Sequence, residues 1–264
     1  MATSPPSIRR TSSVYNLENR FLERNPVVTV VGCGGTGCFV AEGLARLLPR
    51  NIYLLLIDHD RVEERNLGRS SYTRADVDQF KSKVMARRLA QHYQRPVGYS
   101  IAPVGLTEIH KGLIIGCVDN CAARKVIADN WKGYSWWVDS GNDRNYGQIL
   151  IGNTPKEHLA PAFTDGICFR LPLPTIQHPE LLTQVAPRPS CNDLVAAGDQ
   201  GPTINQAMGA IVLEVVRRII EGTCPWMQLY LDLDAGTLTP VLATPEMVSS
   251  ITGRRVKELT KKGG

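Results

Sequence analysis

The sequence predicts an α/β fold: a doubly wound, mostly parallel sheet with helices on both faces. Apolar runs rich in β-branched residues alternate along the chain with segments of helical periodicity, which is the order of elements in such folds. The apolar runs are continuous, as in parallel strands that are covered on both faces. A glycine-rich turn joins the first run to the first helical segment. Together these observations favour one large domain.

Each element follows from its local pattern. Residues 27–31 form a β-branched run that ends at Gly32, and residues 36–48 place apolar side chains at helical spacing. Residues 52–57 form a second apolar run, which Asp58 closes. The same patterns predict further strands at 97–101, 112–118, 135–139, 146–151, 227–233 and 238–242, and further helices at 76–92, 122–131 and 203–220.

Three segments fall outside these patterns. Residues 1–13 are rich in Pro and Ser and contain no acid, which predicts a mobile N-terminal arm ahead of a domain at 14–248. Residues 153–202 contain eight prolines and little periodicity, which predicts a long loop without secondary structure and with a lid or binding role. Residues 249–264 predict a basic, frayed C-terminal tail.

Composition excludes several classes of protein. The chain has 264 residues, 43% hydrophobic and 21% charged, which excludes collagenous, coiled-coil and wholly disordered proteins. A dispersed net charge of +5 argues against a nucleic-acid partner. No apolar run approaches the roughly 18 residues of a membrane-spanning helix, and the first residues lack the apolar core of a signal peptide. We therefore expect a cytoplasmic protein with no membrane association.

The cysteines predict reduced thiols. Seven cysteines, odd in number and irregular in spacing, argue against a disulfide framework in a chain of this size. None forms a C-x-x-C pair, so no structural zinc is expected. Cys33 and Cys38 flank the glycine turn and are expected to fill space beside the first helix as small buried side chains.

The glycine turn predicts a nucleotide site. Gly32, Gly34, Gly35 and Gly37 form a G-x-G-x-x-G pattern between a predicted strand and a predicted helix, the context in which this pattern is informative. Such glycines let backbone N–H groups approach a phosphate at a helix N-terminus. Asp58, at the end of the second strand, is placed to accept hydrogen bonds from ribose hydroxyls. A turn that needs glycine only for packing is the alternative, and both a dinucleotide and ATP fit the pattern.

The residues after the second strand distinguish between these ligands. Starting at Asp58 they read D-H-D-R-V-E-E-R-N-L-G-R, which includes Asp60, Asn66 and Arg69. This segment resembles the D-x-D-x-V-x-x-x-N-L-x-R signature of the ThiF/MoeB and ubiquitin-activating superfamily. The glycine turn, a lysine at the start of the next helix, and Asp119 followed by Asn120 at the end of a later strand complete the resemblance.

The resemblance extends from about residue 20 to residue 242. It implies a Rossmann-like domain of the adenylating type, with the segment 153–202 as a long crossover loop. Residues 189–206 are similar, more narrowly, to the ThiF-family proteins of PRTRC plasmid cassettes. The chain departs from the pattern at Ser70, where relatives carry glutamine, and in lacking the paired zinc cysteines of many relatives.

The resemblance implies ATP-dependent adenylation of the C-terminal glycine carboxylate of a ubiquitin-like or sulfur-carrier protein of the β-grasp fold. This nucleophile is already ionised, so no general base is needed. Arg69 and Lys83 are expected to neutralise phosphate oxygens, with Lys81 as the competing lysine, and Asn66 to bond a phosphate or ribose oxygen. Asp119 is expected to hold Mg²⁺, with capping of the next helix as its alternative role.

The resemblance also implies partners. Relatives act as dimers and complete the site with an arginine of the partner subunit, for which Arg20 and Arg24 are candidates; the polar face of a short helix is the alternative reading of both. Cys191, ahead of Asn205 and a predicted helix N-terminus, is a candidate to take the activated acyl group as a thioester, and Cys168 is the second candidate. A conjugating-enzyme-like protein would then receive the carrier.

Two other classes of function remain open. An NAD-dependent oxidoreductase would use the same glycine turn and Asp58, although no residues form a clear hydride-transfer site. A non-catalytic nucleotide-binding adaptor would keep the fold while binding a partner. Binding of NAD without ATP favours the first class, and ATP binding without turnover favours the second.

Overall fold

The computed structural model describes residues 14–23, 26–106, 112–183 and 203–260. Its centre is an eight-stranded sheet with the strand order β11-β10-β7-β6-β5-β2-β3-β4. These strands are β2 (Val27–Val31), β3 (Tyr53–Ile57), β4 (Val97–Ser100), β5 (Gly112–Gly116), β6 (Trp136–Asn142), β7 (Tyr146–Gly152), β10 (Trp226–Asp232) and β11 (Thr237–Leu242).

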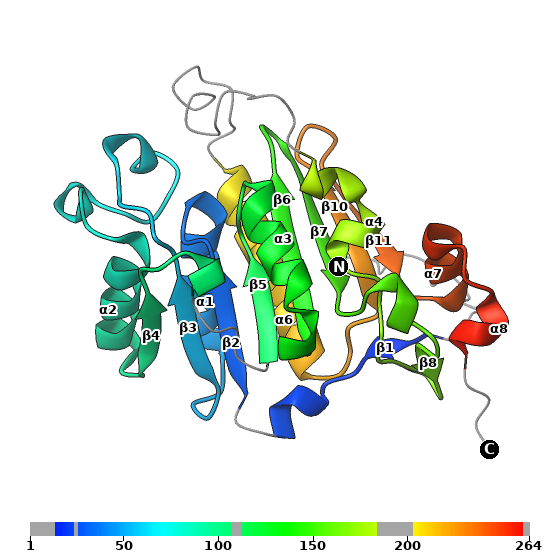
Figure 1. Cartoon of the computed structure of the whole chain (residues 1–264). Helices are drawn as coiled ribbons and strands as arrows, with labels where there is room; N and C mark the ends of the chain where they lie inside the picture. Colours follow the sequence, from blue (N-terminus) through cyan, green and yellow to red (C-terminus); the bar gives the residue numbers. More distant parts are fainter. Residues whose placement is uncertain (1–13, 24–25, 107–111, 184–202, 261–264) are drawn as a thin grey trace, which may run out of the picture.

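Most of this sheet is parallel. The neighbouring strands β6, β5, β2, β3 and β4 pair in parallel, and β7, β10 and β11 extend the sheet by antiparallel pairing. Every residue of β5 and all but the first of β3 are buried, because helices cover both faces of the sheet (Figure 1). The predicted doubly wound, mostly parallel sheet is confirmed.

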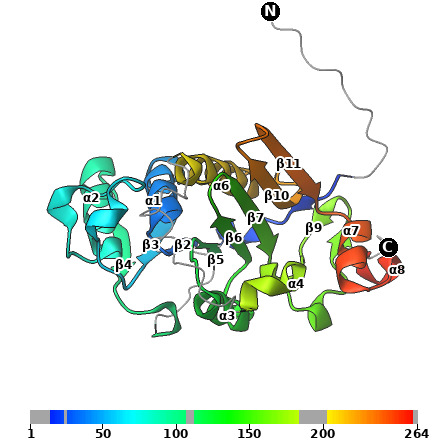
Figure 2. The same cartoon turned by 90° about the horizontal axis from the view of Figure 1, so that it is seen from above.

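The helices form one layer on each face. α1, α2 and α6 lie on one side of the sheet, and α3 and α4 lie on the other (Figure 2). Their bounds are α1 (Gly35–Leu47), α2 (Lys81–Tyr93), α3 (Cys121–Asp129), α4 (Pro174–Gln177) and α6 (Ile204–Ile220). None of the helices in the described part of the chain combines the length and the apolar character needed to span a bilayer.

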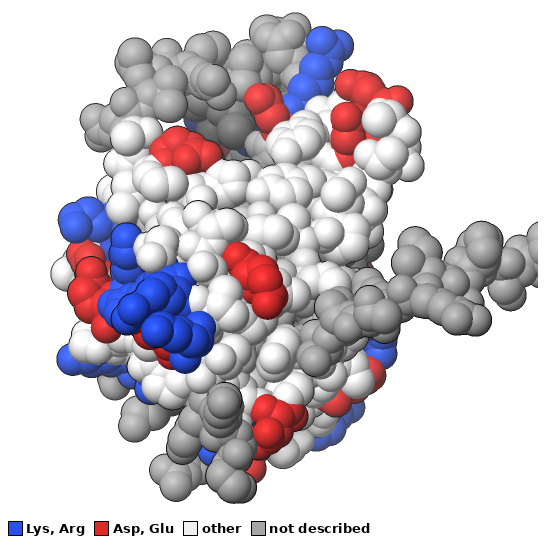
Figure 3. Space-filling model, turned by 90° about the vertical axis from the view of Figure 1, so that its right-hand side faces the viewer, with Lys and Arg blue, Asp and Glu red and all other residues white. Residues whose placement is uncertain are grey.

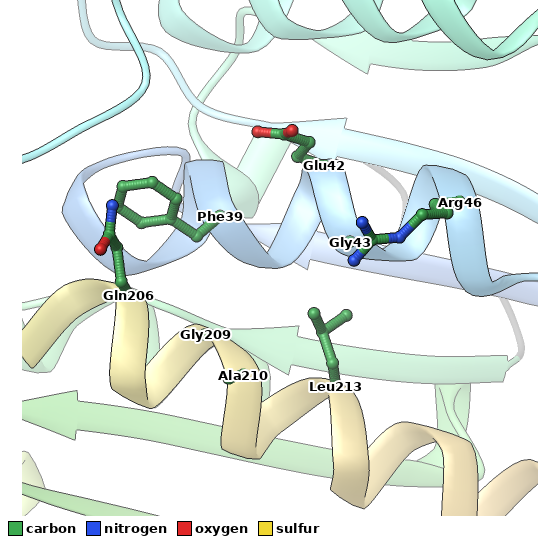
Figure 4. A pocket seen from close by; sticks show the side chains of 8 residues that line it. All are labelled: Phe39, Glu42, Gly43, Arg46, Gln206, Gly209, Ala210 and Leu213. Carbon is green, nitrogen blue, oxygen red and sulfur yellow. The ribbon is translucent and has the colours of Figure 1, made fainter.

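Glycines allow α1 and α6 to pack closely. A Cβ on Gly43 of α1 would lie 2.1 Å from Cδ1 of Leu213, and a Cβ on Gly209 of α6 would lie 3.0 Å from Cβ of Phe39. Figure 4 shows the Leu213 side chain pointing toward Gly43 from the facing helix. The two helices therefore act as one layer that fixes the start of α6 against the start of α1.

The predicted helix at 76–92 begins later than expected. Its first residues instead form the 3₁₀ turn η3 (Arg74–Asp76), in which the Asp76 carboxylate accepts a hydrogen bond of 2.7 Å from the N–H of Thr73. Asp78 then adopts a left-handed φ of 68°. Because this backbone conformation is incompatible with a continuous helix, α2 starts only at Lys81.

The prediction of a loop without secondary structure is wrong for the described part of 153–202. This part contains β8 (Phe163–Thr164), β9 (Ile167–Cys168), α4, and the 3₁₀ turns η6 (Lys156–His158) and η7 (Pro179–Leu182). β9 pairs with β8 and with β1 (Asn16–Leu17), which forms a second, three-stranded sheet. The rest of the predicted loop, 184–202, and the predicted arm, 1–13, lie outside the described residues.

The expectation of a frayed tail is also wrong for its described part. The chain forms α7 (Pro245–Thr252) and α8 (Val256–Leu259), and both Val248 and Leu259 are fully buried. The N–H of Ala162 donates a 2.8 Å hydrogen bond to the carbonyl oxygen of Leu259. On this side of the molecule several basic side chains form a cluster, and acidic side chains lie in several separate places on a mostly uncharged surface (Figure 3). The tail exposes basic side chains and buries apolar ones. Composition alone does not distinguish such a packed segment from a frayed one.

We expect Leu259→Ala to lower the free energy of unfolding by about 2–5 kcal/mol, because it deletes a fully buried side chain. Lys257→Ala, on the same short helix but exposed, is the matched control and should change it by less than about 0.5 kcal/mol. Chemical denaturation followed by circular dichroism measures both. Equal stability of the two variants would show that α8 does not pack as described.

Candidate functional site

Parallel pairing brings the predicted site residues to one edge of the sheet. Val31, the last residue of β2, pairs with Ile57 of β3 and with Gly116 of β5. The segments that follow these three strands therefore leave the sheet at the same level. We call this the carboxyl edge; it comprises the residues that follow β2, β3 and β5.

The glycine turn is shaped by two close backbone contacts. Gly32 has a φ of +89°, and a Cβ there would lie 2.5 Å from the carbonyl oxygen of Cys117. A Cβ on Gly37 would lie 1.9 Å from the carbonyl oxygen of Gly32. At Gly34, in contrast, a Cβ would meet nothing within 4 Å. Among the described residues no side chain caps α1, and the space beside Gly34 is open, so this end of the helix suits a phosphate group.

The Asp58 carboxylate ties this turn to the end of β3. Its Oδ2 accepts a 2.6 Å hydrogen bond from the N–H of Cys33, and its Oδ1 accepts a 2.8 Å hydrogen bond from the N–H of Asp60. Burial raises the pKa of the Asp58 carboxyl, while the Lys81 ammonium and the two N–H groups oppose that shift. Each carboxylate oxygen keeps further acceptor capacity, so a ribose hydroxyl can still donate to Asp58.

The structure brings Lys81, and not Lys83, to the carboxylates of this edge. Nζ of Lys81 lies 3.0 Å from Oδ2 of Asp60, and the Lys81 side chain is only 11% exposed. Lys81 is the first residue of α2, so its side chain returns toward the turn that precedes the helix. Lys83 lies two residues further along α2, half-buried, and its role as a phosphate contact stays a prediction.

The signature residues after Asp60 form a turn that is fixed to the glycine turn. Asn66 is buried, and its Oδ1 accepts a 2.9 Å hydrogen bond from the N–H of Glu63. The N–H of Arg69 donates to the carbonyl oxygen of Asn66 at 3.3 Å. Further along, the Tyr72 hydroxyl donates a 2.6 Å hydrogen bond to the carbonyl oxygen of Cys33. The turn therefore holds Asn66 and Arg69 against the carboxyl edge.

Asp119 and Asn120 follow β5 with different environments. Oδ1 of Asn120 accepts a 2.8 Å hydrogen bond from the N–H of Ala123, which makes Asn120 the N-cap of α3. The alternative role of Asp119 as the cap of this helix is therefore wrong. The Asp119 side chain is exposed at the carboxyl edge. Mg²⁺ is commonly held by one or two carboxylates together with substrate phosphates, so a single exposed carboxylate here fits that ion.

A second acidic group lies nearby. Within the described ranges, Asp58, His59 and Asp60 form the one group of three side chains close enough to share a metal ion. Both oxygens of Asp58 already accept backbone hydrogen bonds, and Asp60 faces the Lys81 ammonium. These contacts make the group better suited to the ribose end of a nucleotide than to a cation.

A buried ion pair beside β5 was not predicted. Nε of Arg124 lies 3.2 Å and 3.1 Å from the two carboxylate oxygens of Asp139, and the two side chains are 9% and 0% exposed. Burial raises the pKa of the Asp139 carboxyl, and Arg124 opposes that shift. The signal available in the sequence was that Asp139, like Asp58 and Asp119, closes a predicted apolar strand.

Of the candidate thiols and arginines, the structure describes one of each. Cys191 and Arg24 lie outside the described residues. Cys168 is fully buried in β9, and burial raises the pKa of its thiol far above the ordinary value, so it is poorly suited to act as a nucleophile. Arg20 lies in the 3₁₀ turn η1 (Arg20–Glu23), where its exposed side chain pairs with Glu18 at 3.1 Å.

The fold and the carboxyl edge define a protein of the doubly wound class with the features of a nucleotide site: a glycine turn leads into an uncapped helix, and acidic residues follow the neighbouring strands. The sequence pattern of the ThiF family matches residues 22–247. The chain therefore belongs to the ThiF family, which confirms the resemblance found in its motifs.

Two curated relatives are similar to a large part of the chain. The chain is 28% identical over 230 residues to the adenylyltransferase and sulfurtransferase uba4 of Emericella nidulans, covering 82% of this chain and 45% of the relative. It is 32% identical over 161 residues to the ubiquitin-like modifier-activating enzyme 5 of Dictyostelium discoideum, covering 53% of this chain and 40% of the relative. The chain thus spans less than half the length of these relatives.

Solved structures share the fold. PaaA superposes with a TM-score of 0.57 at 18% identity, covering 84% of this chain and 75% of PaaA. MccB of E. coli, in a structure with AMPCPP and MccA, superposes with a TM-score of 0.53 at 16% identity, covering 85% of this chain and 65% of MccB. At these identities the likeness concerns the fold alone.

We expect Gly37→Ala to destabilise the protein by about 1–3 kcal/mol or more, because the added methyl group collides with a backbone oxygen that cannot move freely. Gly34→Ala is the matched control in the same turn and should cost less than about 1 kcal/mol, since its methyl group meets open space. Thermal and chemical unfolding compare the two variants. Similar losses at both positions would contradict the close contact described for Gly37.

Proposed function

We propose that this chain binds ATP and Mg²⁺ at the carboxyl edge and adenylates the C-terminal glycine carboxylate of a ubiquitin-like or sulfur-carrier protein of the β-grasp fold. The observation that carries the proposal is the double hydrogen bond of the Asp58 carboxylate, which holds the glycine turn beside Asp60 and Lys81. Family membership supports the same reaction, because relatives are named as adenylyltransferases and as a ubiquitin-like modifier-activating enzyme.

The residues of the edge suit the two ends of the nucleotide. The backbone N–H groups at Gly34 and Gly35 would receive phosphate oxygens at the N-terminus of α1, where the helix dipole favours negative charge. Asp58 would accept the ribose hydroxyls. Arg69 would neutralise phosphate charge together with a lysine of α2, and Asn66 would bond a phosphate or ribose oxygen.

The proposed step moves no proton. An oxygen of the carrier carboxylate forms a bond to the α-phosphorus of ATP while the bond from that phosphorus to the bridging oxygen of pyrophosphate breaks. The electron pair of the broken bond leaves with pyrophosphate, and the carrier becomes an acyl adenylate. The nucleophile is ionised from the start, so the site needs positive charge and not a general base.

Asp119 is the proposed Mg²⁺ ligand. Bound there, the ion would supply charge screening to the phosphates that depart as pyrophosphate. Asn120 would support the same end of the nucleotide while its Oδ1 caps α3.

A second stage would follow in a homodimer. A thiolate at Cys191 would attack the acyl carbon of the adenylate, which releases AMP and leaves the carrier as a thioester. A conjugating-enzyme-like protein, the partner implied by the PRTRC resemblance, would then receive the carrier. An arginine of the partner subunit, supplied from position 20 or 24, would complete the adenylation site.

The first test is the exchange of labelled pyrophosphate into ATP in the presence of candidate β-grasp carriers. We expect carrier-dependent exchange that Asp119→Ala reduces by at least about 100-fold, because the ligand of the charge-screening ion is lost. Cys191→Ala should leave exchange intact and abolish only a thiol-sensitive adduct on a non-reducing gel. ATP binding without exchange with any carrier would contradict adenylation and support a non-catalytic adaptor.

The two lysines of α2 give a second test. Lys81→Ala should reduce carrier-dependent exchange by about 10²–10³-fold, since Lys81 is the lysine that lies at the carboxyl edge. Lys83→Ala, two residues along the same helix, is the matched comparison and should retain most of the activity. The reverse order of losses would assign the phosphate contact to Lys83.

A further inference from the structure

A chain of polar side chains connects α6 to the glycine turn. Asn205, the second residue of α6, is only 2% exposed. Its Oδ1 lies 3.0 Å from Oγ1 of Thr36, in the first turn of α1, and 3.3 Å from Nδ2 of Asn142, at the end of β6. Its Nδ2 lies 3.5 Å from the carbonyl oxygen of Arg69. One amide on α6 therefore contacts three other segments of the chain.

Donor and acceptor counting gives these contacts a direction. The Thr36 hydroxyl has a single proton, and it lies 2.9 Å from Oδ1 of Asn142 as well as near Asn205. When the Thr36 hydroxyl donates its proton in a hydrogen bond to Oδ1 of Asn142, Nδ2 of Asn142 donates to Oδ1 of Asn205. Nδ2 of Asn205 then donates to the Arg69 carbonyl oxygen. The hydrogen bonds therefore run in one direction, from Thr36 to the backbone of Arg69.

The glycine turn is built to admit this amide. A Cβ on Gly35 would lie 2.6 Å from Nδ2 and 2.7 Å from Cγ of Asn205. Glycine at this position therefore lets the Asn205 side chain reach Arg69 across the start of α1. The close packing of α1 against α6 holds the two helix starts at that distance.

We infer that Asn205 is a positioning residue, which fixes the backbone of Arg69 relative to the glycine turn and so orients the Arg69 guanidinium at the carboxyl edge. The positioning role of Asn205 follows from these contacts alone, whereas its effect on the reaction rate rests on the proposed function. No other described contact joins α6, α1, β6 and the signature turn through one side chain.

The deciding experiment is hydrogen–deuterium exchange of the full chain, with Asn205→Asp as the variant. Aspartate keeps the size and the acceptor oxygen but loses the N–H donor to the Arg69 carbonyl oxygen. We expect the peptide that covers residues 64–72 to exchange about threefold faster or more than in the wild type. Gln206→Ala, the exposed neighbour on α6, is the matched control and should leave this peptide unchanged.

Pyrophosphate exchange provides the functional readout. Asn205→Asp should lower the rate about 10–100-fold, as losses of supporting contacts typically do, with a much smaller change in KM for ATP. Burial raises the pKa of the introduced carboxyl, and its protonated form regains a donor. The activity of the variant relative to the wild type should therefore recover in part as the pH is lowered. A general loss of structure would not recover in this way.

The outcomes separate the two claims. Unchanged protection of residues 64–72 in Asn205→Asp would overturn the positioning role, whatever the activity. Increased exchange of this peptide in a chain that shows no pyrophosphate exchange with any carrier would keep the positioning role and reject the proposed function. Where Asn205→Asp fails to fold, Asn205→Ala removes the same N–H donor without adding a charge. Unchanged protection of residues 64–72 in that variant would likewise overturn the role.

Discussion

The contact between Gly37 and the carbonyl oxygen of Gly32 is the constraint on which the carboxyl edge depends. A Cβ at Gly37 would lie 1.9 Å from that oxygen, so only a glycine lets α1 begin directly against the end of β2. The close approach of α1 to the end of β2 also places the Cys33 N–H within hydrogen-bond distance of the Asp58 carboxylate. The phosphate end and the ribose end of the candidate site are therefore held together by a close backbone contact and by the hydrogen bond from the Cys33 N–H to the Asp58 carboxylate.

The order and type of the main elements were predictable, because they depend on periodicity within each segment. The runs 27–31 and 146–151 and the helix at 203–220 match their observed elements to within one residue at each end. The errors fall where contacts distant in sequence decide the structure. Strands of two residues, such as β8 and β9, are too short to carry any periodicity and form because β1 and the tail pair with them.

The candidate site divides in the same way. Its glycines and Asp58 lie in short motifs with fixed spacing, so the sequence reveals them. The difference between Lys81 and Lys83 depends on where α2 begins, which the left-handed Asp78 determines. Contacts such as Asn205 with Arg69 join residues 136 positions apart, and no local pattern records them.

The three-stranded sheet ties both ends of the described chain to its middle. Asn16 pairs with Ile167, and Phe163 forms a bridge with Thr260. Contacts of such large sequence separation form only after the later segment has been synthesised, and they close slowly. On the ribosome, β1 therefore stays unpaired until residue 167 has emerged. The outer edge of β8 stays unpaired until residue 260 has emerged. The nascent protein keeps an open edge of this sheet, accessible to chaperones, until residue 260 has emerged.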